Sequence, residues 1–166
     1  MNNFRNIGID PSGTIWIASI HDGFFSYNPD TGSIKRYYKE MDPENRYKKN
    51  GVKITQFRIG RNNRIWIGTN AGLIRFDMKT ETCYRYPFRM AKTREKNSDT
   101  TLNSPYVCQI FEDQGGSVWI GTIFGGMQRL DPKTDRFVSY PFDGDEDSSF
   151  PGNTAALIFQ DSTGYI

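Results

Sequence analysis

The chain is poor in the residues from which metal and catalytic sites are usually built. It has one histidine, His21, and two cysteines, Cys83 and Cys108, too few for a zinc or iron–sulfur ligand set. The two cysteines stand in alternating, aromatic-rich segments, which indicates small buried or half-buried side chains rather than reactive ones. We therefore expect no metal and no cofactor.

The chain also lacks long apolar runs and an excess of charge of one sign. No stretch approaches the ~20 apolar residues of a membrane-spanning helix. The 21 basic and 19 acidic residues leave a net charge of +2, which gives no electrostatic reason to expect binding to nucleic acid or an anionic membrane. Since repeat sequence begins directly after Met1 and stops inside a further repeat, both ends are expected to be cuts, and any membrane attachment to come from segments not included.

What the chain does contain is a short motif that occurs three times. It consists of an aliphatic residue, Trp, Ile, Gly or Ala, and Thr or Ser, and it is centred on Trp16, Trp66 and Trp119, which are 50 and 53 residues apart. Residues 163–166 begin a fourth copy. A fixed period of this length is typical of architectures in which each unit buries its apolar face against its neighbours.

Each unit divides into four short runs with the alternation of β-strands. In the third unit these runs are 107–112, 118–122, 127–130 and 136–140, separated by turns rich in Gly, Asp and Pro. Four-stranded antiparallel units of this size are the blades of β-propellers. The sequence thus predicts an all-β fold, a propeller fragment of about three four-stranded antiparallel blades plus the start of a fourth. As one propeller domain, it divides into units 1–53, 54–105, 106–153 and 154–166.

Nine residues that recur with the unit are predicted to serve the fold. The Trp of each unit is expected on an inner strand, packed between adjacent blades; the alternative is a row of exposed indoles that forms a platform for sugars. The glycines are expected at turns and close approaches. Asn63 stands where other units have a turn glycine, and Asn tolerates the same left-handed backbone. The nine are Trp16, Trp66, Trp119, Gly13, Gly68, Gly72, Gly121, Gly125 and Gly126.

The third unit carries a family resemblance. The run Gly-Ser-Val-Trp-Ile-Gly-Thr-Ile-Phe-Gly-Gly-Met-Gln-Arg-Leu-Asp at 116–131, followed by Lys-Thr-Asp-Arg-Phe-Val-Ser-Tyr at 133–140, resembles the two-component regulator propeller repeat. The resemblance extends over all units and is weakest in the first, where Ala18 and Ser19 replace Gly-Thr. It implies the periplasmic sensor propeller of Bacteroidetes-type hybrid histidine kinases, which detects glycan fragments. The partners that the resemblance implies are an oligosaccharide and the remaining blades of the protein, while kinase chemistry belongs to domains absent here. A homodimer is a further expected partner, because blade faces left open favour self-association.

Up-and-down blades place their connections on two opposite faces. The short first and third turns of each unit share one face, and the second turns share the other with the links 39–53, 88–105 and 142–153. Long, unlike links in a compact repeat favour a binding role. Arg and aromatic side chains suit sugars through bidentate hydrogen bonds and ring stacking. The candidate ligand-binding residues on this face are His21, Asp22, Arg46, Tyr47, Asn70, Arg89 and Phe124.

Three functions are compatible with this pattern: a ligand sensor without chemistry of its own, a propeller that binds protein rather than sugar, and a lyase-type enzyme. The acids of the first and third turns recur once per unit, so we interpret them as turn formers rather than a carboxylate pair flanking a cleft. Ser-His-Asp chemistry could use only His21, which no nucleophile motif accompanies. We also expect exposed terminal blade faces to cause marginal stability or self-association.

Overall fold

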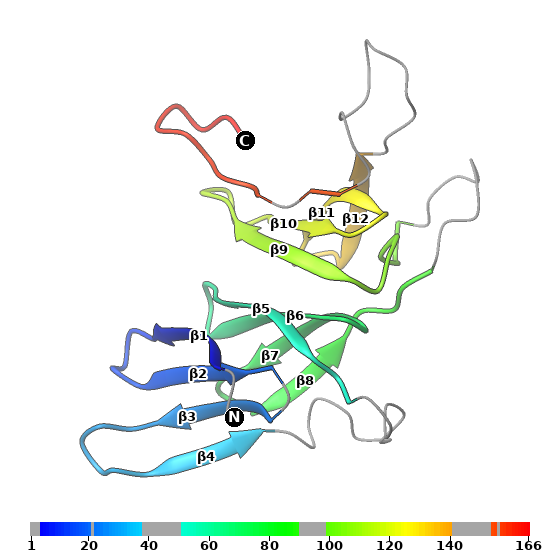
Figure 1. Cartoon of the computed structure of the whole chain (residues 1–166). Coiled ribbons are helices and arrows are strands. Elements are labelled where there is room, and N and C mark those ends of the chain that lie inside the picture. The colour runs from blue at the N-terminus through cyan, green and yellow to red at the C-terminus, as the bar shows by residue number, and fades with distance from the viewer. Residues whose placement is uncertain (1–3, 21, 38–50, 90–98, 141–153, 156) are drawn as a thin grey trace.

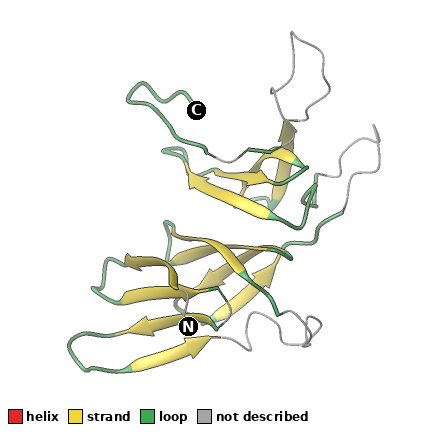
Figure 2. Ribbon diagram, viewed as in Figure 1, coloured by secondary structure: helices red, strands yellow, loops and turns green. Residues whose placement is uncertain are grey.

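The computed structural model describes residues 4–20, 22–37, 51–89, 99–140, 154–155 and 157–166. Among these residues there are twelve strands and no helix, arranged in three four-stranded antiparallel sheets (Figure 1; Figure 2). The prediction of an all-β fold with about three four-stranded blades is confirmed.

The first sheet contains β1 (Phe4–Ile9), β2 (Ile15–Ser19), β3 (Gly23–Tyr27) and β4 (Ile34–Tyr37). The second contains β5 (Ile54–Ile59), β6 (Arg64–Thr69), β7 (Gly72–Asp77) and β8 (Thr82–Arg85). The third contains β9 (Val107–Glu112), β10 (Val118–Thr122), β11 (Gly126–Asp131) and β12 (Arg136–Tyr140).

Within each sheet the strands follow chain order, so every connection is a hairpin. The first hairpin turns need a residue with positive φ, which Gly13 and Gly116 supply with φ of 86°. Asn63 takes the equivalent place in the second sheet with φ of 56°, the left-handed conformation that the sequence predicts for it. The turn is therefore retained without glycine.

The first strand of each sheet is the innermost strand of its blade. β1 lies against β5, and β5 lies against β9, across the three sheets (Figure 1). Polar side chains connect these strands: Asn6 Nδ2 donates to the Phe57 carbonyl at 2.9 Å, and Gln56 Nε2 donates to the Cys108 carbonyl at 2.9 Å. The sheets therefore follow one another as successive blades.

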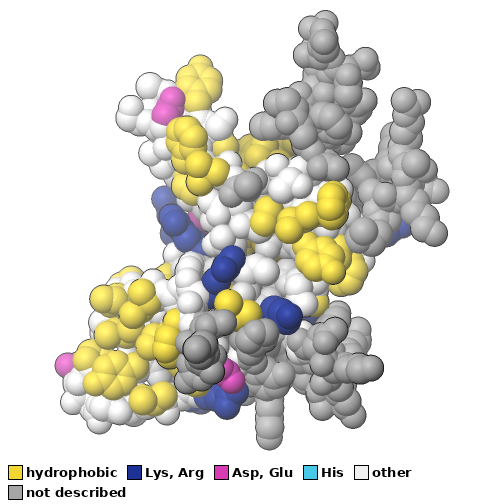
Figure 3. All heavy atoms as spheres, viewed as in Figure 1, with side chains coloured by type: hydrophobic (Ala, Val, Ile, Leu, Met, Phe, Trp, Pro, Cys, Tyr) yellow, Lys and Arg dark blue, Asp and Glu magenta, His cyan; other side chains and the backbone are white. Residues whose placement is uncertain are grey.

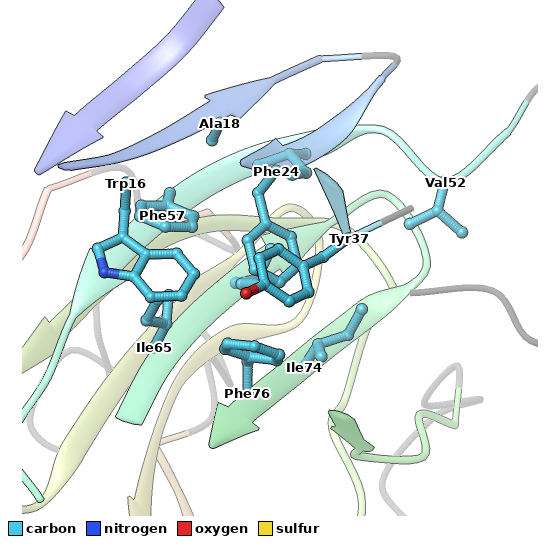
Figure 4. Close-up of a cluster of buried hydrophobic side chains, with 11 residues drawn as sticks. Trp16, Ala18, Phe24, Tyr37, Val52, Phe57, Ile65, Ile74 and Phe76 are labelled. Carbon is cyan, nitrogen blue, oxygen red and sulfur yellow. The ribbon is translucent and has the colours of Figure 1, made fainter. Parts of the chain in front are cut away.

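The hydrophobic core lies between neighbouring sheets. At the first junction, Trp16, Phe24 and Tyr37 of the first sheet pack against Phe57 and Phe76 of the second (Figure 4). At the second junction, Trp66 of β6 and its neighbours pack against the third sheet in the same way. All three Trp residues are buried, Trp119 against Ile158. These described residues therefore provide no row of exposed indole rings as a platform for sugars.

The glycine of the Trp-Ile-Gly-Thr motif allows close approach of the chain that follows. A Cβ added to Gly68 would lie 2.7 Å from Val107 Cγ1, and one added to Gly121 would lie 1.9 Å from the Ala155 carbonyl oxygen. In the first sheet the equivalent position is Ala18, which is completely buried. Because real Cβ atoms do not approach other atoms so closely, the first strand of the following unit could not take its place with larger residues here.

A tyrosine and an acid close each junction at its outer edge, an arrangement called here the tyrosine–acid contact. Tyr37 Oη donates to Glu81 Oε1 at 2.9 Å, and Tyr86 Oη donates to Asp135 Oδ1 at 2.6 Å. Both acids occupy equivalent third turns with positive φ, 56° and 55°. Burial, together with the hydrogen bond to Asp135, raises the pKa of Tyr86 far above its usual range, so this hydroxyl stays a donor.

The final described segment follows the third sheet into the position of a next unit. Thr154 forms a parallel bridge with Gly126, and residues 161–164 form a turn like the other first turns. No strand is formed within residues 157–166. The predicted unit boundaries after residues 53 and 105 stay predictions, and that at 153 lies outside the described residues. Of the residues described, none belongs to a helix that could cross a membrane.

Candidate functional site

On one face of the sheets, the short first turns are held by acids that are already engaged in hydrogen bonds. Asp10 Oδ1 accepts from the backbone N–H of Ser12 at 2.9 Å and of Thr14 at 3.1 Å, while Oδ2 accepts from Trp16 Nε1 at 2.8 Å. Burial alone would raise the pKa of Asp10. The hydrogen bond from the Ser12 hydroxyl at 2.6 Å, together with those just named, outweighs burial and lowers the pKa. Asp10 therefore fixes its turn and the indole of the same unit.

The third sheet repeats this hydrogen bond between a turn acid and the Trp of the same unit. In the second sheet, the carboxylate beside the turn comes from the third sheet instead. Asp113 Oδ2 accepts from Trp119 Nε1 at 2.7 Å. In the second sheet the acid is replaced by Gly60, where an added Cβ would lie 2.4 Å from Glu112 Oε2 and 2.8 Å from Trp66 Nε1. The Glu112 carboxylate, at the end of β9, accepts from the Arg61 N–H at 3.0 Å. The face built from first and third turns is thus occupied by structural hydrogen bonds.

The opposite face, called here the loop-bearing face, carries the second turns and the residues that flank the links. Figure 1 shows the β5–β6 turn at one side of the second sheet and the β6–β7 turn and the exit of β8 at the other. Of the predicted ligand-binding residues, Asp22, Asn70, Arg89 and Phe124 are described here. His21, Arg46 and Tyr47 lie outside the described residues. Ligand contact by any of them stays a prediction.

Two of the described candidates are engaged in holding the chain. The Asp22 carboxylate accepts from Ser19 Oγ at 3.1 Å and pairs with Arg36 at 3.4 Å. Asn70 accepts from the Lys53 N–H through Oδ1 at 2.8 Å and donates its own N–H to the Lys53 carbonyl at 3.2 Å. Asn70 therefore positions the entry to β5.

Phe124 is one of the exposed residues among the described candidates. Its side chain is 69 % exposed and its φ is 65°, a left-handed conformation that is unusual for a bulky residue. Its N–H lies 3.5 Å from Thr154 Oγ1, the acceptor of a long hydrogen bond. Strained residues of this kind persist where the surroundings hold them, and they are frequent at ligand sites. The structure thus presents an aromatic ring to solvent from a fixed turn.

The candidate set predicted from the sequence does not include Tyr106, which lies beside this turn. Tyr106 is 46 % exposed, and its carbonyl accepts from the N–H of Ile123, the residue before Phe124, at 2.9 Å. The preceding residue, Pro105, accepts from the Gly72 N–H at 2.7 Å, so the same segment touches the second turn of the second sheet. Figure 3 shows hydrophobic side chains gathered at this side of the third sheet. The position of Tyr106 at the end of a link was the signal that could have identified it.

The link between the second and third sheets is anchored at its base. Arg89 is exposed, and its N–H donates to the Leu102 carbonyl at 2.8 Å. The Asn103 N–H donates to Gln128 Oε1 at 2.8 Å, and Gln128 Nε2 donates to Ser139 Oγ at 3.1 Å. These buried polar groups fasten the end of the link to β11 and β12. As a result, Tyr106 is presented from a rigid support.

Comparison with known proteins supports this fold. The family model described as two component regulator propeller matches residues 101–124, which include the link end, β9 and the third Trp motif. The resemblance inferred from the sequence is confirmed over this segment. The chain has no significant match among curated proteins.

Solved structures extend the similarity to almost the whole chain. The extracellular domain of BT4673 from Bacteroides thetaiotaomicron, described as a one component system, matches with a TM-score of 0.72 and 15 % identity over 97 % of this chain. That of BT3049, described as a hybrid two component system from the same organism, matches 97 % of the chain with 19 % identity and a TM-score of 0.45. PorZ, a surface component of the type-IX secretion system of Porphyromonas gingivalis, matches 95 % with 12 % identity and a TM-score of 0.50. The chain spans 19 %, 24 % and 29 % of these three chains, respectively. The similarity to the BT4673 domain thus shows that this chain has a propeller-type fold.

Proposed function

We propose that this chain is a ligand-sensing segment of the extracytoplasmic, periplasmic input region of a two-component sensor histidine kinase, and that its ligand is an oligosaccharide. In this proposal the chain binds without catalysing a reaction, and the kinase resides in other domains. The observation that carries the proposal is a pair of exposed aromatic residues on the loop-bearing face, Phe124 and Tyr106. Their segments are joined by the backbone hydrogen bond between Ile123 and Tyr106.

The chemistry of this face fits a sugar. Aromatic rings bind the apolar faces of pyranose rings by stacking, and they lose little conformational entropy when they do so. Here the backbone of Phe124 is fixed by its turn and that of Tyr106 by the anchored link, so the positions from which both rings extend are pre-organised. Arg89, exposed at the base of the same link, can add hydrogen bonds to sugar hydroxyl or carboxylate groups. The proposed binding surface therefore combines stacking with directional polar contacts.

A thermal-shift screen against plant, host and algal oligosaccharides tests this proposal. A ligand that binds the native state raises the melting temperature. We expect the shift to disappear in Phe124→Ala and in Tyr106→Ala, and no sugar to be converted to product. Tyr84→Ala is the control, because Tyr84 is also 46 % exposed but lies on the outer strand β8.

A protein partner is the alternative function. The structural similarity to PorZ favours this alternative, because PorZ is a surface component of a secretion system. Exposed aromatic residues are also common anchors in protein interfaces. If no sugar raises the melting temperature while one defined protein co-purifies and is lost in Phe124→Ala, the interaction module replaces the sensor.

A further inference from the structure

Acidic side chains are unevenly distributed between the two faces of the sheets. Apart from Asp22 and Asp99, every acidic residue in the described part of the chain belongs to a first or third turn or to the strand end beside it. Asp22 pairs with Arg36 at 3.4 Å, and Asp99 pairs with Arg136. Within the described residues, the loop-bearing face therefore carries no acid without an arginine partner.

Lys53 occupies in the second unit the position that Tyr106 occupies in the third. Each residue stands directly before the first strand of its sheet, Lys53 before β5 and Tyr106 before β9. Each carbonyl accepts a backbone N–H from the second turn of its own sheet, from Asn70 at 3.2 Å and from Ile123 at 2.9 Å, respectively. A cation in one unit thus stands where the next unit has an exposed aromatic residue.

Backbone contacts bring Lys53 and Tyr106 to the same turn, which connects β6 and β7. At the start of this turn, Asn70 Oδ1 accepts from the Lys53 N–H at 2.8 Å. At its end, the Gly72 N–H donates to the carbonyl of Pro105, the residue before Tyr106, at 2.7 Å. Lys53 and the segment that carries Tyr106 therefore contact the two ends of one turn.

A second cation lies on the neighbouring innermost strand. Arg5 of β1 is exposed, and its Nε donates at 3.1 Å to the carbonyl of Thr55, two residues after Lys53. Thr55 Oγ1 donates in turn to the carbonyl of Val107, the residue after Tyr106. In Figure 1, β5 lies between β1 and β9. The two cations and Tyr106 thus follow one another along adjacent innermost strands.

This arrangement favours one class of sugar. Among the described residues, neither Arg5 nor Lys53 has an acidic partner. A surface with positive charge and no compensating acid attracts anions, and ammonium and guanidinium groups bind carboxylate and sulfate through charge-assisted hydrogen bonds. We infer that the ligand of this surface is an acidic oligosaccharide. Lys53 and Arg5 bind its carboxylate or sulfate group, while a sugar ring stacks on Tyr106 or Phe124.

The inference rests on the proposed function, to which it adds the chemical class of the sugar. Isothermal titration calorimetry of the purified protein tests it with carboxylated probes (oligogalacturonates) and sulfated probes (carrageenan and heparin oligosaccharides). Each probe is paired with its neutral counterpart, in which the carboxylate is reduced to the alcohol or the sulfate removed. We expect the neutral form to bind at least about tenfold more weakly, and the charged form to weaken as NaCl rises from about 50 to about 500 mM.

The result identifies the source of the anion and separates two failures. Preference for the carboxylated or the sulfated probes shows which group the surface recognises. Equal affinity for charged and neutral forms overturns the inference. If only neutral sugars bind, and binding is lost in Phe124→Ala, the proposed function holds and this inference fails. If no sugar of either kind binds, the proposed function itself fails.

Substitution of the lysine tests which residue reads the charge. Lys53→Met removes the charge while keeping a long side chain, so the Kd for the acidic sugar should rise at least about tenfold and that for its neutral counterpart by less than about twofold. Lys53→Arg should keep the affinity within about threefold, because it retains the charge. The matched control is Lys79→Met, an exposed lysine in the third turn of the same sheet, on the opposite face.

Two outcomes contradict the assigned roles. If Lys53→Met weakens charged and neutral sugars equally, or Lys79→Met has the same effect as Lys53→Met, charge recognition by Lys53 is overturned. Arg5→Gln is expected to weaken the acidic sugar by about threefold or more, less than Lys53→Met, because the Arg5 side chain is exposed. Unchanged affinity in Arg5→Gln removes Arg5 from the site.

Discussion

Replacing Tyr86 with Phe is expected to lower the free energy of unfolding by about 1.5 kcal/mol, without changing the fold. The substitution removes one hydroxyl from a ring that is 1 % exposed. That hydroxyl donates to Asp135 Oδ1 at 2.6 Å and accepts from Arg75 Nη1 at 3.0 Å. Hydrogen bonds to charged groups contribute about 1.5–3 kcal/mol. The lower end applies because the Asp135 side chain is partly open to solvent.

A double-mutant cycle with Asp135→Asn isolates the contact itself. Asn is suitable because it tolerates the φ of 55° at this position and keeps the size of the side chain. We expect the two substitutions to be non-additive by about 1 kcal/mol in urea unfolding at pH 7, since residues joined in one hydrogen-bonded network couple by about 0.5–3 kcal/mol. Arg75 keeps its contact with the Asp135 carboxylate in Tyr86→Phe, which limits the loss in that variant.

The outcome that would refute this reasoning is additivity. If Tyr86→Phe and Asp135→Asn add to within about 0.3 kcal/mol, the hydroxyl and the carboxylate do not stabilise each other, and the tyrosine–acid contact is only a consequence of packing. A coupling of the expected size shows that the hydroxyl and the carboxylate stabilise each other.

Three further outcomes follow from the turns and the Trp motif. Gly121→Ala should release the segment that covers Trp119, because the new Cβ would lie 1.9 Å from the Ala155 carbonyl oxygen. We expect a red shift of the Trp fluorescence and a loss of about 1–3 kcal/mol in the free energy of unfolding, measured in urea. Unchanged emission would contradict this expectation. Asn63→Ala should cost about 1 kcal/mol and Asn63→Gly almost nothing, because only the former strains a backbone with φ of 56°; equal losses in thermal unfolding would exclude this explanation. Since the pKa of Asp10 in the fold is below its ordinary value of 3.8, its hydrogen bonds should stabilise the fold above about pH 4, and this stabilisation should be lost as the pH falls below that value. In urea unfolding between pH 6 and pH 3, the free energy of unfolding should therefore decline less in Asp10→Asn than in the wild type.

The fold could be predicted because the determinants recur and act locally. Trp16, Trp66 and Trp119 fix the period, while the alternation between them and the turn residues fixes the strands. The left-handed Asn63 was predictable for the same reason, since the backbone requirement of a tight turn depends on one residue. Periodicity and turn chemistry therefore account for the three sheets.

Interactions between units were less predictable because they join residues distant in the sequence. The contact of Tyr86 with Asp135 spans 49 positions, and no local pattern marks an acid in a turn as the acceptor for another blade. In the same way, Gly60 would be interpreted as a defect of its own unit, although Glu112 of the next sheet fills the space. For the candidate site, Asn70 was selected because second turns vary, but its amide is used to hold Lys53. Its structural role depends on a backbone contact that sequence alone does not contain.

The two faces of these sheets therefore differ in how freely they can change. On the face of the first and third turns, Asp10 serves its turn and its Trp at once, and Glu81 serves the neighbouring blade, so a substitution there weakens more than one contact. On the loop-bearing face, Phe124 and Tyr106 expose their rings while their backbones are held by neighbouring strands. Their side chains can thus be exchanged with little effect on the junctions. A repeat built in this way can change what it binds while it keeps the same blades, which is the property that a family of sensors for different ligands requires.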